Sequence, residues 1–157
     1  MNNLEFVEEV KKILKLPTVF AYGTYGEKVT DELIAKVYLT QRHKYHTDEN
    51  ILKLKRHCGE YAYECSALIT EPLGLVNRPS ANDIYRMSKE KFLIEDMPDI
   101  PGTCVYFLGH VGVYLGNATV AESTYSSDFG FGVVATNILD RPWTTAFKLP
   151  WIDYKEE

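Results

Sequence analysis

Three residues that lie far apart in the chain, Cys65, His110 and Glu122, are of the types that nucleophilic catalysis requires. Cys65 begins the apolar run Cys65-Ser66-Ala67-Leu68-Ile69, which predicts the start of a helix. A thiol at a helix N-terminus lies at the positive end of the helix dipole, which lowers its pKa and favours the thiolate. A cysteine in such a position is more often a packed core residue, so a nucleophile is indicated only if a base lies nearby.

The candidate base, His110, opens a segment typical of a β-strand, His110-Val111-Gly112-Val113-Tyr114-Leu115-Gly116. Side chains on a strand alternate between its two faces, so His110 and Gly112 share one face. The glycine leaves space beside the imidazole. A lone histidine on a strand is usually structural, but one beside glycine and downstream of a cysteine at a helix start favours a catalytic base.

Glu122, twelve positions after His110, could fix the orientation of the imidazole. A three-residue turn around residues 116–118 would place Gly112 opposite Glu122 and make His110 its diagonal neighbour, roughly 7–8 Å away at the backbone. A two-residue turn would move Glu122 to the other face. We therefore predict that His110 and Glu122 share a face and that the hairpin has an odd-numbered loop or a bulge. The alternative, a solvated strand glutamate, stays open.

The elements that must position these residues are helices in the first part of the chain and strands in the second. Helices are predicted over residues 4–14, capped by Asn3, from Thr30, from Thr47 to about His57, from Cys65 until Pro72 ends it, and after Ser80. Residues 18–26 are predicted as a loop. Strands are predicted over residues 103–108, 110–115, 119–124, 133–136 and 146–149. This order indicates an α+β fold, and the 157 residues suit one domain.

Composition and charge exclude several other classes of protein. The net charge of −5 and the lack of a basic cluster argue against binding to nucleic acid. No apolar stretch approaches the roughly 20 residues that span a bilayer, and residues 1–12 do not resemble a secretion signal. Three cysteines form neither an even disulfide framework nor a paired zinc motif, and Cys104 is expected in the core.

A second cluster, formed by His43, His46, His57 and Cys58, could suggest zinc. The segment is highly charged and lacks a familiar zinc spacing, so a solvated helical surface is expected instead. We expect no metal ion and no cofactor.

The three candidate catalytic residues lie in motifs that resemble those of the NlpC-type cysteine peptidases. The matching segments are Glu64-Cys65-Ser66-Ala67, Gly109-His110-Val111-Gly112-Val113-Tyr114-Leu115-Gly116-Asn117 and Val120-Ala121-Glu122. The loop Phe20-Ala21-Tyr22-Gly23-Thr24 looks like the upstream aromatic element of that family. The segments Asp140-Arg141-Pro142-Trp143 and Pro150-Trp151-Ile152 are similar to a branch found in phage lysins and prophage proteins of Gram-positive bacteria.

The resemblance implies a papain-like fold, with N-terminal helices packed on a C-terminal antiparallel sheet. It implies an endopeptidase that cuts stem peptides of bacterial peptidoglycan through a thioester, with Cys65 as nucleophile, His110 as base and Glu122 as the orienting group. Tyr22, Tyr25 and Ser66 are the expected substrate-binding residues. Phe20 stands where relatives often have a tyrosine, so either Tyr22 or Tyr25 substitutes for that tyrosine or its function is absent. Glu64 and Ala67 depart from the usual Asp and Gly.

The sequence is also compatible with two other functions. One is an amidase or acyltransferase on the same scaffold, and the other is a non-catalytic structural or binding component of a phage or mobile element. We expect synthesis in the cytoplasm and action at the bacterial cell wall. Delivery to the wall would then require another chain, such as a holin.

Overall fold

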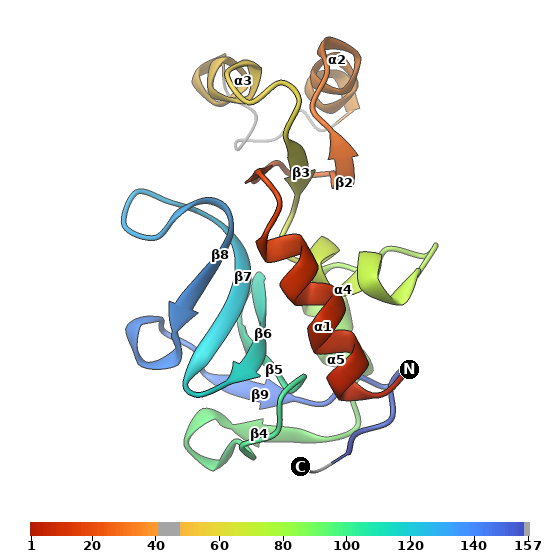
Figure 1. Ribbon diagram of the computed structural model, residues 1–157, viewed down its shortest axis with the longest axis vertical. Helices are drawn as coiled ribbons and strands as arrows, with labels where there is room; N and C mark the ends of the chain where they lie inside the picture. Colours follow the sequence, from red (N-terminus) through yellow and green to blue (C-terminus); the bar gives the residue numbers. More distant parts are fainter. Residues whose placement is uncertain (41–47, 156–157) are drawn as a thin grey trace.

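Helices lie against one face of an antiparallel sheet in the computed structural model, which describes residues 1–40 and 48–155 (Figure 1). The helices are α1 (Asn3–Leu14), α2 (Asp31–Thr40), α3 (Asp48–Lys55), α4 (Ala67–Leu73) and α5 (Ala81–Met87), with short 3₁₀ helices η1 (Ile94–Asp96) and η2 (Ile138–Asp140). The strands are β1 (Thr18–Val19), β2 (Tyr25–Lys28), β3 (Tyr61–Tyr63), β4 (Lys91–Leu93), β5 (Cys104–Phe107), β6 (His110–Gly116), β7 (Thr119–Ser126), β8 (Gly130–Asn137) and β9 (Thr145–Phe147).

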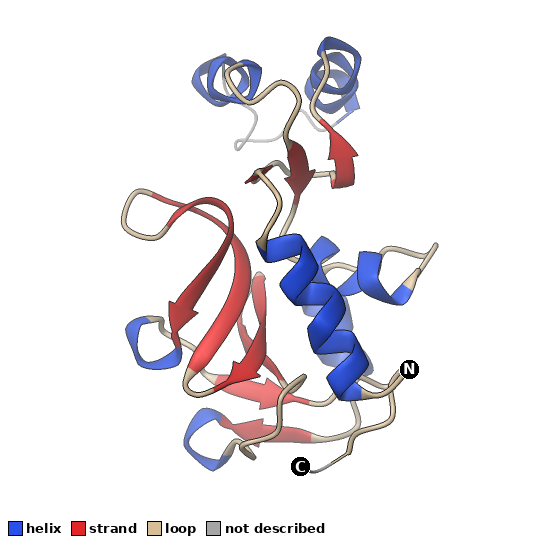
Figure 2. Ribbon diagram, in the orientation of Figure 1, coloured by secondary structure: helices blue, strands red, loops and turns tan. Residues whose placement is uncertain are grey.

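The main sheet has six strands in the order β4-β9-β5-β6-β7-β8, and every pairing in it is antiparallel (Figure 2). Strands β5 to β9 correspond to the five predicted from the sequence. The predicted α+β class, with N-terminal helices packed on a C-terminal antiparallel sheet, is confirmed. Strand β4 was not predicted, because its three residues are too few for an alternating pattern to be recognised.

One hydrophobic core joins the helices to the sheet. The apolar residues that recur at helical spacing in α1, Phe6, Val10 and Ile13, are buried in this core. Leu68 of α4 and Val113 of β6 are fully buried in the same cluster. The nucleophile candidate therefore lies just before helix α4, and the base candidate lies on strand β6, and both elements are packed into one core.

A second, smaller part of the chain, which we call the small lobe (residues 18–40 and 48–63), stands at the top of Figure 1. It contains a three-stranded sheet in the order β1-β3-β2, flanked by α2 and α3. Its own core includes Val29, Leu33, Val37, Leu54 and Ala62. Residues 18–26, expected as a loop, contain β1 and the start of β2, which pair with β3 rather than with each other.

Two predicted helix boundaries are corrected by the structure. Asn3 is not the cap of α1: the Asn2 side chain accepts a hydrogen bond from the Glu5 N–H and caps the helix. Pro72 does not end α4, which continues to Leu73 and stops at Gly74. Gly74 has a φ of 64°, in the left-handed region that commonly ends helices. No helix among the described residues is both long enough and apolar enough to cross a membrane.

The fully buried Asn3 side chain ties the two ends of the chain together. Its amide nitrogen donates to the carbonyls of Pro101, at 2.8 Å, and Lys155, at 3.1 Å. Its oxygen accepts from the backbone N–H of Lys155. These bonds hold the C-terminal segment against the start of α1.

We predict that Asn3→Ala lowers the free energy of unfolding by about 3 kcal/mol, because three buried hydrogen bonds are lost together. The neighbouring Asn2→Ala should cost only about 1 kcal/mol, the usual value of a helix cap. Urea denaturation of the two variants measures the difference. Equal losses would contradict the clamp assigned to Asn3.

Candidate active site

The hairpin of β6 and β7 brings the candidate base and its partner onto one face. Gly112 pairs with Glu122, as the sequence predicted, and the register shifts between Tyr114 and Gly116. This shift compensates for a turn of only two residues, 117–118, whose φ angles of 50° and 58° are typical of a tight hairpin. The prediction of an odd-numbered loop or a bulge is confirmed by the bulge, since a regular two-residue turn would have moved Glu122 to the opposite face.

His110 and Glu122 are joined by a hydrogen bond inside the protein. His110 Nε2 lies 2.9 Å from Glu122 Oε1, and Glu122 is 0% exposed, so it is not a solvated strand glutamate. Thr136 Oγ1 donates to the other carboxylate oxygen at 2.6 Å. An ionised carboxylate can only accept, so Nε2 carries the proton and Nδ1 is left as the acceptor of the neutral imidazole.

Arg141 completes the surroundings of this carboxylate. Its Nε and Nη2 lie 3.1 and 3.0 Å from Glu122 Oε1, and Nη2 also donates to Thr124. Burial favours the neutral acid, but the hydrogen bonds from His110 and Thr136 and the electrostatic interactions with His110 and Arg141 outweigh it and hold the pKa of Glu122 below its ordinary value. Sequence reasoning missed this role, because Arg141 stands in a motif nineteen positions away and no local spacing links it to Glu122.

Two aromatic rings fix the plane of the imidazole. Trp143 stacks on His110 with ring centroids 5.4 Å apart and an angle of 9° between planes, and Phe107 lies at 5.0 Å. Gly112 was expected to leave open space beside His110, but the indole fills that space. A Cβ at Gly112 would lie 3.1 Å from a ring carbon of Trp143 and 2.7 Å from Val120.

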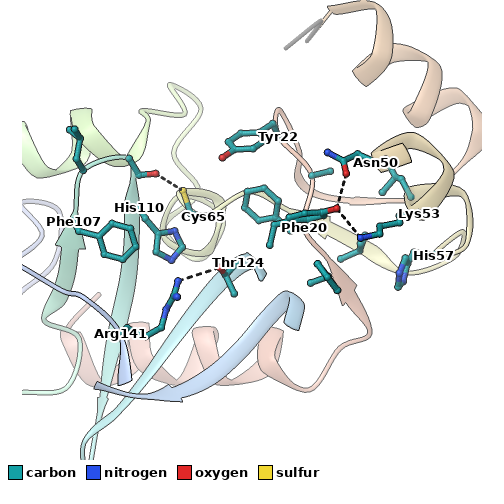
Figure 3. A pocket seen from close by; sticks show the side chains of 17 residues that line it. Phe20, Tyr22, Asn50, Lys53, His57, Cys65, Phe107, His110, Thr124 and Arg141 are labelled. Atoms are coloured by element: carbon teal, nitrogen blue, oxygen red, sulfur yellow. Dashed lines mark hydrogen bonds between the residues drawn. The ribbon is translucent and has the colours of Figure 1, made fainter. Parts of the chain in front are cut away.

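Cys65 lies in the short link between β3 and α4, and its side chain lies beside that of His110 (Figure 3). Its Sγ is 3.8 Å from the carbonyl oxygen of Gly109, the residue before His110. Because Nε2 of His110 is bonded to Glu122, Nδ1 is the ring nitrogen that remains for the thiol. The geometry thus brings together the three residues that the sequence singled out.

The predicted lowering of the Cys65 pKa is wrong for this arrangement. Burial, with a smaller contribution from Glu64, raises the pKa of the thiol to about 12. Helix α4 begins two residues later, at Ala67, and has only seven residues, so its dipole cannot offset this burial. Backbone N–H groups of Ser66 and Val111 act in the opposite direction. A thiolate at this buried position requires a positive charge close by.

Glu64 connects the nucleophile to the aromatic loop of residues 20–26. One carboxylate oxygen accepts from the Gly23 N–H at 2.8 Å, and the other accepts from the Ser66 hydroxyl at 2.6 Å. Burial is the largest of the causes that raise the pKa of Tyr25, and Glu64 adds to it. The Glu64 carboxylate therefore positions the loop and the Cys65 segment relative to each other.

Two cavities meet at Cys65. The larger, about 380 Å³, is lined by residues of the small lobe and of the main sheet: Val19, Phe20, Ala21, Tyr22, Asn50, Lys53, Leu54, His57, Cys65, Phe107, Leu108, Gly109, His110, Thr124, Tyr125, Phe131 and Arg141. The smaller, about 160 Å³, is lined by Tyr22, Glu64, Cys65, Ser66, Ser80, Ala81, Asn82 and Gly109. Figure 3 shows the larger cavity, with Cys65 and His110 on one side and Lys53 on the other.

The three predicted substrate-binding residues lie in different positions. Tyr22 lines both cavities and meets Phe20 edge to face at 4.9 Å. Ser66 lines the smaller cavity with its hydroxyl turned onto Glu64. Tyr25 lines neither of these two cavities and instead lies under the guanidinium of Arg78, 4.2 Å from its ring centroid.

The zinc alternative receives no support from the described residues. His43 and His46 lie outside them. Within residues 1–40 and 48–155, no group of three or more His, Cys, Asp or Glu side chains is arranged to hold a metal ion. His57 Nδ1 pairs with Glu60 at 2.8 Å, and Cys58 is exposed. Cys104 is buried, as expected of a core residue.

Comparison with solved structures shows the fold. No family model matches the sequence, and no curated protein sequence matches it. NlpC2 and NlpC1 from Trichomonas vaginalis match 97% and 94% of this chain, with TM-scores of 0.60 and 0.59 and identities of 18% and 20%. The chain spans 48% and 44% of their lengths, about half of each.

Two bacterial-type domains match over nearly their whole length. The NlpC/p60 domain of the peptidoglycan hydrolase SagA has a TM-score of 0.54 and 12% identity, covering 95% of this chain and 100% of that domain. The P60 domain of an antigen from M. avium subspecies paratuberculosis has a TM-score of 0.58 and 17% identity, covering 97% and 98%. The fold is therefore the papain-like fold of NlpC/p60 domains.

We predict that His110→Ala slows alkylation of Cys65 by iodoacetamide at least about tenfold at pH 7, because the thiol loses the group that can take its proton. In this variant the rate should continue to rise as the pH approaches about 12. Peptide mass spectrometry measures the labelling, and the exposed Cys58 in the same sample is the control. Unchanged labelling of Cys65 would show that His110 does not take the proton of the Cys65 thiol.

The lowered pKa of Glu122 predicts how stability depends on pH. A carboxyl group whose pKa is lowered by folding stabilises the protein at pH values above its ordinary pKa of 4.5. This contribution is lost as the pH falls through the lower pKa of the folded state. The difference in melting temperature between wild type and Glu122→Gln should therefore be large at pH 6 and shrink below about pH 4. A difference that does not change with pH would show that Glu122 is not held ionised.

Proposed function

We propose that the protein is a cysteine peptidase that hydrolyses amide bonds in the stem peptides of bacterial peptidoglycan. The observation that carries the proposal is the cysteine beside a buried, oriented histidine at the meeting point of two cavities. The fold of NlpC/p60 domains supports it, and so does the name of one structural neighbour, SagA, which is a peptidoglycan hydrolase. The motif around His110 adds the resemblance to NlpC-type peptidases.

The first half of the reaction transfers the acyl group to Cys65. His110 Nδ1 takes the thiol proton as the sulfur attacks the scissile carbonyl, so the thiolate forms next to an imidazolium. The ionised Glu122 stabilises that positive charge through the Nε2–H bond. The backbone N–H of Cys65 donates to the oxyanion. The intermediate collapses, His110 returns the proton to the departing amine, and a thioester remains on Cys65.

The second half restores the enzyme. His110 removes a proton from water, the resulting hydroxide attacks the thioester, and the sulfur leaves and is protonated by the imidazolium. The product is a carboxylic acid. Cys65, His110 and water provide every proton and electron pair, so the proposed reaction requires no metal ion and no cofactor.

Arg141 and Trp143 act through the histidine. Arg141 keeps Glu122 ionised and in place, and the stacked indole restricts rotation of the imidazole. Both are positioning residues for His110. We further propose that the protein reaches the wall with the help of another chain, such as a holin, and that Tyr22 and Ser66 contact the bound peptide.

We predict that Cys65→Ala abolishes release of fragments from purified peptidoglycan and that His110→Ala nearly does, because members of a catalytic unit act together. Glu122→Gln should retain more activity, since an amide oxygen still accepts the bond from Nε2–H but carries no charge. Mass spectrometry of the fragments measures each loss and identifies the scissile bond. Cys58→Ala is the matched control and should behave as wild type.

A chelator and a thiol alkylator distinguish a thiol-dependent mechanism from a metal-dependent one. Activity should survive the chelator and disappear with the alkylator. Digestion that persists in Cys65→Ala but fails with the chelator would overturn the proposal. Release of amines or transfer of acyl groups without cleavage of the stem peptide would instead identify an amidase or acyltransferase on this scaffold.

A further inference from the structure

The larger cavity has a charge distribution unlike that of the whole chain. The chain carries 22 acidic and 17 basic residues, a net charge of −5. Among the described residues that line the cavity there is no aspartate and no glutamate, but there are two cations, Lys53 and Arg141. A concave site that lacks negative charge attracts anionic groups, because low-dielectric walls focus the potential of its cations.

The two cations are not equivalent. Arg141 is committed to Glu122, with two of its nitrogens about 3 Å from one carboxylate oxygen. No ion pair joins Lys53 to a carboxylate of the described residues, and its ammonium group instead interacts with the Tyr125 hydroxyl and with the rings of Tyr125 and Phe131. Lys53 is therefore the lining cation, in the described part of the chain, whose charge is not neutralised by an ion pair.

The ammonium group of Lys53 is held at the cavity wall. Its Nζ donates to the Tyr125 hydroxyl at 3.0 Å and lies 4.6 Å from the ring centroid of Phe131. The Tyr125 hydroxyl in turn donates to Asn50 Oδ1 at 2.7 Å, so its oxygen faces the lysine as an acceptor. An ammonium has three donors, and Tyr125 takes one of them. The others can bind a ligand without displacing an existing ion pair.

We propose that Lys53 determines specificity by binding a carboxylate that the substrate carries away from the scissile bond. Lys53 comes from α3 in the small lobe, whereas Cys65 packs in the main core and His110 lies on strand β6 of the main sheet. A peptide that occupies the cavity from Cys65 to α3 places one of its residues beside Lys53 (Figure 3). The preferred substrate is therefore an acidic peptide. The inference rests on the proposed function and assigns that site its charge preference.

The test uses peptides that react with Cys65 without being hydrolysed. Each carries a bromoacetyl group followed by alanines, with a single glutamate at each position in turn and a second series with glutamine instead. In wild type, at one position at least, the glutamate peptide should alkylate Cys65 about tenfold faster than its glutamine partner, the usual size of a charge-assisted hydrogen bond. Added salt should reduce this ratio by screening.

Substitutions in α3 test whether the preference for the glutamate peptide depends on the Lys53 side chain. Lys53→Gln should bring the ratio to about one, and Lys53→Arg should largely keep it. Lys55→Gln is the matched control, because Lys55 lies on the same helix, is exposed and does not line the cavity. A ratio that is the same in wild type and Lys53→Gln at every position would overturn the proposal. So would a wild type with no preference at low salt, even if a variant failed to fold.

The outcome is distinguishable from failure of the proposed function. Alkylation requires an accessible Cys65 but no turnover. A Lys53-dependent preference in a protein that releases nothing from peptidoglycan would keep the carboxylate site and reject the hydrolase. With active protein, Lys53→Gln should raise KM for an acidic stem peptide about tenfold and leave kcat and the KM of its amidated counterpart unchanged.

Discussion

The carboxylate of Glu122 is the constraint on which the site depends. A charge with no solvent exposure is stable only if donors surround it, and here they come from three separate segments: His110 on β6, Thr136 on β8 and Arg141 after η2. Their positions require the bulge at the end of β6 and the register of β7 with β8. The same bonds that keep Glu122 ionised fix the tautomer of the histidine. The contacts that form when the sheet folds are therefore the same contacts that orient His110.

The buried thiol is the counterpart of this arrangement. Cys65 is 8% exposed, and burial raises the pKa of its thiol to about 12. In the proposed mechanism, the imidazolium that accompanies thiolate formation is stabilised by Glu122 and by its contact with Trp143. Reactivity would then be a property of the pair and arise when the proton moves from Cys65 to His110. The low exposure of the sulfur also disfavours adventitious oxidation, which requires thiolate character and exposure.

Sequence reasoning succeeded where the signal was local. The alternating pattern after His110 and the parity of the hairpin were sufficient to place Gly112 opposite Glu122, and helical spacing located α1 and α5. It failed where a contact joins distant segments. Arg141, Trp143 and Lys53 reach the site through tertiary packing that no spacing in the chain encodes. Strands of two to four residues, such as β1 and β2, are too short for periodicity, and the Cys65 pKa depends on burial that only the folded core determines.

The small lobe has its own core, with no buried residue in common with the cluster that packs Cys65, and β3 is the segment that contributes to both. Lys53 therefore stands on a helix whose buried residue, Leu54, packs in a different cluster from Cys65. If the proposed function holds, this separation lets substitutions in α3 change which peptides are accepted while the cluster around Cys65 stays the same. In engineering, α3 is then the element to redesign for a new substrate charge.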